Sequence, residues 1–497
     1  MPPGMSRWLL LLLNCIDGLH QSTMGTVRFF RNSTRLFRYH VPTEFVVLAI
    51  LEFLVLMASL YLALEIRFVK PDWVDFTGDS FLLKAFLYAV VMQLSLIAFG
   101  VYQRQTGRFA DVLMLRIASG LLLGMIPLGV SYYFVPQFFL GRSVLALTVL
   151  ISFVLISIIR LFFRRVVKER NLWTRVLVLG AGNKARLIVE SQNSGELKGI
   201  NIIGFVRVNG DMQGDPLRNQ IEINEPLDEF VEKHDVDEIV LAMDDRREAS
   251  VPAKELLDCK MSGIDILDLL TFFERRTFKI RLDMLYPSWL YLSEGFHESM
   301  IRRVGKRVFD IGIVMILLPV ALPFMMVTAV AVWVESGFRG SVLYRQTRVK
   351  QDGRLFQIYK FRSMVENAEQ DGVARWAQKD DDRVTFVGRI IRKIRFDELP
   401  QLFNVLKGDM SFVGPRPERP EFVAKLAEQI PYYEERHRVK PGLTGWAQIR
   451  YPYAKNIEDS RQKLQYDLYY VKNFNVFLDI LILLQTAEVV LMSKGAQ

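Results

Sequence analysis

The chain has 497 residues, of which 51% are hydrophobic and 24% charged, and its formal net charge is +9. That length suits about three domains. The composition is too apolar for an ordinary soluble enzyme and too charged for a protein made only of membrane spans. It also excludes a disordered chain, a collagen-like repeat and, with only two cysteines, a disulfide scaffold. We assign the basic excess to lipid headgroups and phosphate ligands, since basic motifs with interleaved aromatic residues are absent; no nucleic acid partner is expected.

The first third of the chain predicts a membrane-embedded part. Residues 1–40 have no small-residue cleavage site and are interpreted as a weakly structured leader, in which Met24 is an alternative start. Within residues 41–170, apolar runs close to the ~20 residues of a spanning helix predict a bundle of four transmembrane helices. Arginines before the first run, between the second and third, and after the fourth place both ends of the bundle in the cytoplasm. The runs are residues 45–63, 85–102, 117–135 and 143–159.

Residues 172–298 alternate short buried-strand patterns with amphipathic helices, which predicts a Rossmann-like α/β domain with a parallel sheet. The first strand leads into Gly180-Ala-Gly182, a turn that can hold a pyrophosphate at a helix N-terminus. NAD would also need an acid after the second strand, but that strand runs into Arg207 and Asn209. We therefore favour a domain that keeps the turn without a cofactor, and whether it binds any ligand stays open.

A further apolar segment covers residues 311–334, which carry no charge. It suits a fifth spanning helix, or a re-entrant helix that enters the membrane, breaks at Leu318–Pro319 and returns, because internal prolines remove helix hydrogen bonds. In the re-entrant interpretation Lys306 and Arg307 anchor the segment at the headgroups. Asp310 is then spaced to pair with either cation.

The last third of the chain contains clustered basic motifs around one acidic pair. Asp397 and Glu398 are adjacent carboxylates in a run of arginine and lysine, and cationic surroundings keep carboxylates ionised as nucleophiles or metal ligands. Arg416 stands between two prolines, which would present its guanidinium rigidly to phosphate oxygens. The motifs in chain order are Tyr344-Arg-Gln346, Lys360-Phe-Arg362, Arg392-Lys-Ile-Arg-Phe-Asp397-Glu398-Leu-Pro-Gln401, Gly414-Pro-Arg416-Pro417 and Val439-Lys440-Pro-Gly.

With these motifs in this order, residues 300–497 resemble the bacterial sugar transferases that move a hexose-1-phosphate from a UDP-sugar to polyprenyl phosphate. The N-terminal half resembles the large undecaprenyl-phosphate glucose phosphotransferase subgroup, and the order of parts is most similar to exosortase-linked members. The resemblance implies a monotopic, α-rich catalytic domain at residues 299–497. It also implies release of UMP, initiation of exopolysaccharide synthesis, and a multi-pass protein of the bacterial inner membrane. Since UDP-sugars are cytoplasmic, it favours the re-entrant helix and cytoplasmic Rossmann-like and catalytic domains.

The resemblance also implies roles for individual residues. Asp397 would attack the sugar-bearing phosphorus and form an aspartyl-phosphosugar, and Glu398 would help to hold Mg²⁺. Arg392 and Arg416 would bind substrate phosphate. For Lys360, Arg362 and Lys440 the alternatives of phosphate binding and ordinary membrane-surface charge stay open.

Two other functions compete with this hypothesis: a membrane-bound enzyme that modifies nucleotide sugars through the Rossmann-like domain, and a non-enzymatic scaffold of a polysaccharide machinery. The only Tyr-x-x-x-Lys match, Tyr451 to Lys455, lies too far along the chain to belong to the Rossmann-like domain. The sequence does not indicate which hexose is transferred, and it leaves homo-oligomer formation open. Expected partners are a UDP-sugar, undecaprenyl phosphate and membrane lipids.

Overall fold

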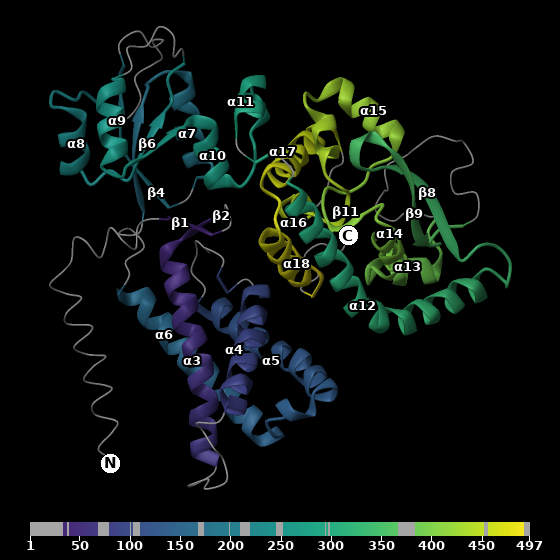
Figure 1. The fold of residues 1–497 in the computed structure, drawn as a ribbon. Helices are drawn as coiled ribbons and strands as arrows, with labels where there is room; N and C mark the ends of the chain where they lie inside the picture. The colour runs from purple at the N-terminus through teal and green to yellow at the C-terminus, as the bar shows by residue number, and fades with distance from the viewer. Residues whose placement is uncertain are drawn as a thin grey trace. The chain divides into compact units, whose positions relative to one another are not determined.

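The computed structural model divides the chain into two compact units, residues 1–277 and 278–497 (Figure 1). This division comes earlier than the domain boundary expected at residue 299, because Phe278 already packs edge-on against Trp446 and Tyr469 in the second unit. The structure describes residues 33–36, 39–67, 79–99, 101–102, 110–166, 173–197, 199–208, 219–244, 252–293, 295–296, 299–365, 383–451 and 456–491.

The first unit begins with a short antiparallel hairpin of β1 and β2, inside the region expected to be a weakly structured leader. Four apolar helices follow at the four expected runs, and α3 and α5 each pack against both α4 and α6. The elements are β1 (Ser33–Leu36), β2 (Tyr39–Pro42), α3 (Thr43–Arg67), α4 (Asp79–Ala98), α5 (Ala110–Phe134), η1 (Pro136–Phe138) and α6 (Arg142–Val166). All four helices are long and apolar enough to cross a membrane.

One buried ion pair joins two of these helices. Glu52 of α3, the charge that interrupts the first apolar run, is fully buried, and both of its oxygens accept hydrogen bonds from Arg160 of α6, at 2.6 and 3.0 Å. Arg160 also donates to the Val101 carbonyl oxygen, and the Tyr102 hydroxyl donates to Glu52. A charge in an apolar bundle is tolerated because it is paired in this way.

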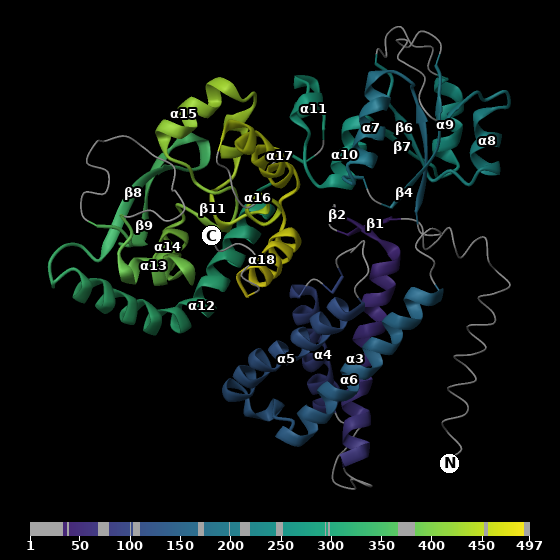
Figure 2. The same cartoon turned by 180° about the vertical axis from the view of Figure 1, so that it is seen from behind.

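The second half of this unit is a five-stranded, all-parallel sheet in the order β5-β4-β3-β6-β7. Helices α7 and α10 lie on one face and α8 and α9 on the other (Figures 1 and 2). The predicted α/β region is therefore confirmed. Its elements are β3 (Thr174–Leu179), α7 (Asn183–Asn193), β4 (Ile200–Val206), β5 (Gln220–Ile221), α8 (Leu227–Lys233), β6 (Glu238–Leu241), α9 (Ala253–Met261), β7 (Asp265–Asp268) and α10 (Leu269–Thr277).

The second unit is rich in helices and contains two small two-stranded sheets, antiparallel β8–β9 and parallel β10–β11. Its helices are α11 (Pro287–Leu292), α12 (Met300–Glu335), α13 (Phe386–Lys393), α14 (Gln401–Lys407), α15 (Pro420–Gln429), α16 (Trp446–Arg450), α17 (Ile457–Asn473) and α18 (Val476–Leu491). The strands are β8 (Leu343–Val349), β9 (Leu355–Phe361), β10 (Ser411–Val413) and β11 (Gly442–Thr444), and 3-10 turns lie at Leu282–Met284, Gln351–Gly353, Phe396–Glu398 and Tyr433–Arg438.

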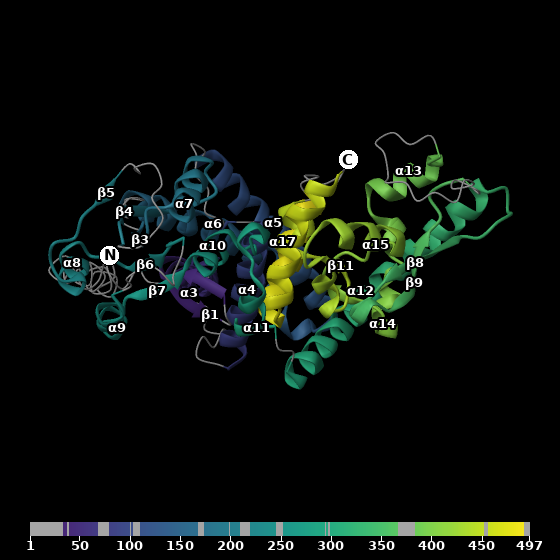
Figure 3. The same cartoon turned by 90° about the horizontal axis from the view of Figure 1, so that it is seen from above.

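Helix α12 contains 36 residues and continues through both Pro319 and Pro323. The break expected at Leu318–Pro319 is instead a bend within one helix, which is visible in Figure 1. Each proline removes one helix hydrogen bond, and contacts on one side hold the bent helix together. Figure 3 shows α12 running beside α14 and β9. Its buried stripe is Lys306, Asp310, Val314, Ala321, Met325, Thr328 and Val332.

Three polar residues near the start of α12 contact other elements of the second unit. Lys306 is buried and donates to Asp479 of α18 at 2.6 Å, to the Tyr470 hydroxyl and to the Val413 carbonyl oxygen. Arg307 donates to the carbonyl oxygens of Val405 and Leu406 at the end of α14.

Asp310 accepts hydrogen bonds from the Ser411 hydroxyl and the Phe412 amide, both at 2.9 Å. Asp310 makes these contacts in place of the expected pairing with Lys306 or Arg307, so that expectation is wrong. The expected position of Lys306 and Arg307 at the lipid headgroups stays a prediction. Lys306 and Asp310 connect α12 to strand β10, Lys306 also reaches α18, and Arg307 reaches α14. A buried polar group must find such a partner.

Candidate active site

The adjacent acids lie on a tight turn between two helices. Helix α13 ends at Lys393, and Arg395 adopts a left-handed conformation with φ 63°, which redirects the chain into the 3-10 turn Phe396–Glu398. Helix α14 then starts directly after Pro400, a residue well suited to a helix start. The Phe396 ring packs on Phe324 of α12, with centroids 5.4 Å apart. The acidic turn is thus held against the bent part of α12.

Asp397 is only 8% exposed, and its Oδ1 has no hydrogen-bond partner among the described residues. Burial raises the pKa of this carboxyl and the neighbouring Glu398 charge raises it further, while Lys360, Arg395 and Arg392 oppose the rise. A carboxylate oxygen without hydrogen bonds keeps its lone pairs available, which favours attack on an electrophile.

Glu398 is held between two cations. Its Oε1 accepts hydrogen bonds from Arg416 at 2.8 Å and from Lys360 Nζ at 3.1 Å. Burial acts to raise the pKa of Glu398, but the charges of Arg416 and Lys360 outweigh it, so that the pKa lies well below 4.5. Glu398 is therefore ionised at neutral pH. Burial lowers the pKa of Lys360, and the negative charge of Glu398 partly offsets this fall.

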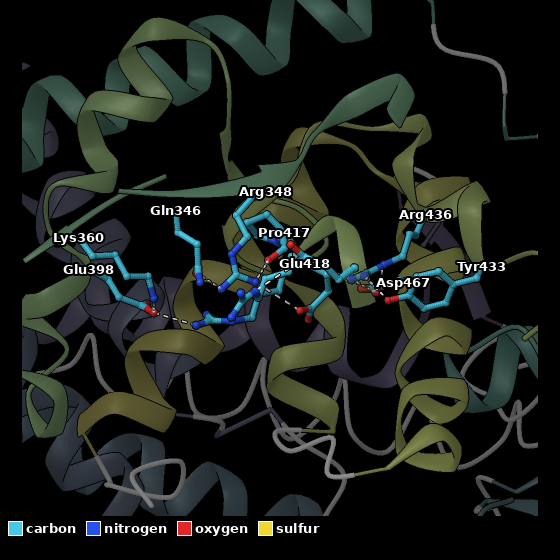
Figure 4. Close-up of polar contacts among 12 residues, drawn as sticks. Gln346, Arg348, Lys360, Glu398, Pro417, Glu418, Tyr433, Arg436 and Asp467 are labelled. Atoms are coloured by element: carbon cyan, nitrogen blue, oxygen red, sulfur yellow. Dashed lines mark hydrogen bonds and ion pairs between the residues drawn. The ribbon is translucent and has the colours of Figure 1, made fainter. Parts of the chain in front are cut away.

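A set of buried residues fixes the segment that carries Arg416. Arg436 donates to the Arg416 carbonyl oxygen at 3.0 Å and pairs with Asp467 of α17 at 2.9 Å. Figure 4 shows these contacts extending from Lys360 and Glu398 to Arg436 and Asp467.

The next residue of this segment is fixed from strand β8. Arg348 of β8 donates to the Pro417 carbonyl oxygen at 3.1 Å and lies 3.5 Å from Glu418. The sequence analysis missed Arg348, Arg436 and Asp467. The available signal was Asp467, an acid next to the apolar and aromatic run Leu468–Val471 of α17.

The structure brings together some of the predicted phosphate ligands. Lys360 and Arg416 contact Glu398 directly, and Arg392, in the last turn of α13, is close enough to lower the pKa of Asp397. Arg362 follows strand β9, and its amide donates to the Val342 carbonyl oxygen. Lys440 lies elsewhere on the second unit, next to Gly408 and the Arg307 guanidinium.

The acidic turn fits Mg²⁺ only if a substrate supplies further ligands. Within the described ranges, no group of three or more His, Cys, Asp or Glu side chains is placed to hold a metal ion. Mg²⁺ is commonly held by one or two carboxylates together with substrate phosphate oxygens. The Glu398 carboxylate, beside the attacking Asp397, could supply one such ligand.

The glycine turn of the first unit is occupied by a side chain of the protein itself. The Asp244 carboxylate, just after β6, accepts hydrogen bonds from the backbone amides of Asn183 and Lys184 at 2.7 and 2.8 Å. The Lys184 amine donates to the carbonyl oxygens of Met243 and Asp244. These amides form the N-terminus of α7, where a nucleotide phosphate would bind in a Rossmann domain.

Two family models match the chain. Residues 301–493 match the bacterial sugar transferase model, and residues 97–266 match a model described as a CoA-binding domain. Asp244 holds a negative charge where the phosphates of CoA or a dinucleotide would meet α7, so the described residues at this turn do not fit either molecule.

Curated relatives agree with the first match. The chain is 44% identical over 242 residues to a UDP-N-acetylgalactosamine-undecaprenyl-phosphate N-acetylgalactosaminephosphotransferase of Aeromonas hydrophila, covering 49% of this chain and 56% of the relative. It is 40% identical over 196 residues to an undecaprenyl-phosphate glucose phosphotransferase of Komagataeibacter xylinus, covering 38% and 36%. It is 30% identical over 369 residues to an undecaprenyl-phosphate galactose phosphotransferase of Salmonella typhimurium, covering 67% and 73%. The chain thus spans about half or less of the length of the first two relatives.

Proposed function

The chain belongs to the bacterial sugar transferase family, and from this premise we propose that it transfers a hexose-1-phosphate from a UDP-sugar to undecaprenyl phosphate. UMP is released, and the product initiates exopolysaccharide synthesis. The observation that carries the proposal is the buried turn in which an unpartnered Asp397 oxygen adjoins Glu398, itself paired with Lys360 and Arg416. The relatives named for glucose, galactose and N-acetylgalactosamine transfer support the reaction class.

In the first half-reaction, the Asp397 carboxylate attacks the phosphorus that carries the sugar. A new O–P bond forms, the P–O bond to UMP breaks, and UMP leaves with the bonding electron pair. In the second half-reaction, a phosphate oxygen of undecaprenyl phosphate attacks the same phosphorus and releases Asp397 as a carboxylate. The raised pKa of Asp397 suits this role, because it makes the carboxylate more nucleophilic than an ordinary aspartate when ionised.

The surrounding cations bind and orient the phosphates. Arg416 offers a rigid guanidinium, and Arg392 and Lys360 add positive charge beside the attacking carboxylate. Mg²⁺, held by Glu398 together with phosphate oxygens of the substrate, would neutralise charge on the diphosphate. Glu398 also keeps Lys360 and Arg416 in place before substrate arrives.

We further propose that α3 to α6 form a four-helix transmembrane bundle in the bacterial inner membrane, and that α12 is re-entrant. Both halves of α12 contact the same folded unit: Arg307 reaches the end of α14, and Glu335 accepts from the Val387 amide at the start of α13. A straight spanning helix would instead be surrounded by lipid along its middle. The catalytic and Rossmann-like regions then both face the cytoplasm, where UDP-sugars are found.

The decisive experiment measures UMP release by the purified full-length protein with undecaprenyl phosphate, Mg²⁺ and a panel of UDP-sugars. We expect release with at least one sugar and loss of turnover in Asp397→Asn. The melting temperature of this variant should not fall, since the substitution removes a buried charge without hydrogen bonds. Asp352→Asn, at an exposed left-handed turn position, is the matched control and should be fully active.

Two results would contradict the proposal. Full turnover in purified Asp397→Asn would exclude the covalent mechanism. Absence of UMP release with every UDP-sugar would favour a scaffold or a nucleotide-sugar-modifying enzyme instead.

A further inference from the structure

A second unpartnered polar group lies at the start of α14, directly after the turn that carries the proposed nucleophile. Gln401 is 3% exposed, and its Nε2 has no hydrogen-bond partner among the described residues. A buried side-chain amide normally donates its hydrogens, and leaving a buried donor unpaired is destabilising. The missing partner of Gln401 Nε2 is explained either by a ligand that binds there or by strain stored in the fold.

The neighbours of Gln401 locate it within the site. Leu399 and Pro400, which join the 3-10 turn Phe396–Glu398 to α14, have right-handed helical backbone angles. Residues three or four apart along this segment are therefore neighbours, as they are in a helix. Glu398, three residues earlier, binds Lys360 of β9. Asn404, three residues later, accepts from the Tyr359 amide and donates to the Gln357 carbonyl oxygen, both on β9. Gln401 thus lies on the side of α14 that faces β9, between Glu398 and Asn404, whose side chains have hydrogen-bond partners on β9.

Gln401 is also four residues after Asp397, whose Oδ1 is the matching unpartnered acceptor on this turn. One buried donor and one buried acceptor are left open at neighbouring positions beside Glu398. This arrangement fits a bound group that bears both an electrophilic centre for the carboxylate and an oxygen for the amide. A phosphoryl group has both.

We propose that Gln401 contacts substrate, donating a hydrogen bond from Nε2 to a non-bridging oxygen of the phosphoryl group that Asp397 attacks. This inference rests on the proposed function and adds a neutral donor to its cationic phosphate ligands. A donor placed where negative charge develops stabilises the transition state more than the bound substrate. Its loss therefore lowers kcat more than it raises KM.

The test compares Gln401→Met with the wild-type protein in the UMP-release assay. Methionine has a similar length and volume but cannot donate. We expect kcat to fall by about 100-fold, the usual effect of losing one such donor, with a change in the KM for UDP-sugar of less than about threefold. The melting temperature should stay equal or rise, because an unpaired buried amide is removed. Gln357→Met, an exposed glutamine on β9, is the matched control and should retain wild-type kinetics.

Each outcome distinguishes a substrate-binding role of Gln401 from a structural role. Lower kcat with an unchanged or higher melting temperature supports the inference. Unchanged kcat overturns it, and so does a fall in melting temperature that accompanies the loss of activity, since Gln401 would then be structural. If Gln401→Met does not fold, Gln401→Leu is measured by the same criteria, and failure of both to fold overturns the inference. The proposed function fails separately, if the wild-type protein itself releases no UMP.

Discussion

At the scale of single residues, the acidic turn carries two carboxyl groups whose pKa values are shifted in opposite directions. Glu398 is ionised and paired on both sides, whereas Asp397 is buried beside it with an unpartnered oxygen. An unsatisfied buried polar group costs about 1–3 kcal/mol of stability. Such a cost suits a group that must react rather than hold the fold together.

The charges around Asp397 predict a specific pH dependence. Attack requires the ionised carboxylate, so activity should fall as pH is lowered through the pKa of Asp397, which burial raises above 3.8. Lys360 opposes that rise. Lys360→Gln should therefore raise the pKa of Asp397 further and move the acidic limb of the pH–kcat/KM profile, which reports the free enzyme, to higher pH. The pH–kcat/KM profiles of both proteins check this.

Lys425→Gln, at an exposed position of α15, removes the same charge away from the turn and serves as the control. Its acidic limb should coincide with that of the wild-type protein. If Lys360→Gln leaves the limb in place or moves it to lower pH, Asp397 is not the group whose ionisation limits the rate.

At the scale of secondary-structure elements, the ion pair between α3 and α6 should be a major determinant of helix packing. Glu52→Gln leaves the buried Arg160 guanidinium without its carboxylate partner. Breaking a buried pair in this way costs about 3–5 kcal/mol. We expect a clear fall in melting temperature of the full-length protein in detergent. The double variant Glu52→Met, Arg160→Met should recover most of the loss, because no unpaired charge remains.

Glu65→Gln, at an exposed position of the same helix, is the matched control for the ion pair and should change the melting temperature little. An equal fall in the control and in Glu52→Gln would show that the pair contributes nothing specific.

The start of α7 yields a prediction about ligands of the first unit. Since Asp244 caps this helix, titration of the wild-type protein with CoA or NAD should give no saturable heat in calorimetry. Asp244→Ala should lower the stability by about 0.5–2 kcal/mol, the usual effect of losing a helix cap. Asp258→Ala, at an exposed position of α9, should be neutral. Saturable CoA binding by the wild-type protein would refute the self-capped turn.

Local patterns in the sequence were sufficient to predict some of these elements and contacts but not others. The strands β3, β4 and β6 follow mainly apolar stretches, β7 contains an apolar pair between two aspartates, and the acidic pair is evident from its motif. The orientation of Lys306 was not predictable, because its partner Asp479 is 173 residues away. The proline rule predicted a break in α12, but packing on one side preserved the helix. The contacts of Arg436 and Arg348 with the Arg416 segment likewise depend on tertiary structure alone.

At the scale of the whole molecule, the side of α12 opposite its buried stripe is apolar. Met315, Val320, Met326 and Val330 are all more than half exposed. Phe386 of α13, on the element that packs against the C-terminal end of α12, is 73% exposed. Large apolar surfaces of this kind mark membrane or protein interfaces. In this family member we assign them to the bilayer, which leaves the polar remainder of the unit in water.

The proposed re-entrant arrangement of α12 leads to the last prediction, which concerns the side of the membrane on which each unit lies. Cysteines introduced singly at exposed positions, in a background lacking Cys15 and Cys259, are probed with an impermeant maleimide in spheroplasts. Lys254→Cys reports on the α/β region, Glu421→Cys on the catalytic region, and Gln137→Cys on the connection between α5 and α6.

Four spanning helices with both ends inside place Gln137→Cys outside, so it should be labelled in intact spheroplasts. Lys254→Cys and Glu421→Cys should be labelled only after permeabilisation, because the re-entrant α12 that we propose would enter and leave on the cytoplasmic face. Labelling of Glu421→Cys from outside, with Lys254→Cys still protected, would mean that α12 spans the bilayer. Asp397 would then be separated from the cytoplasmic UDP-sugars, and neither the re-entrant helix nor the placement of the active site could stand.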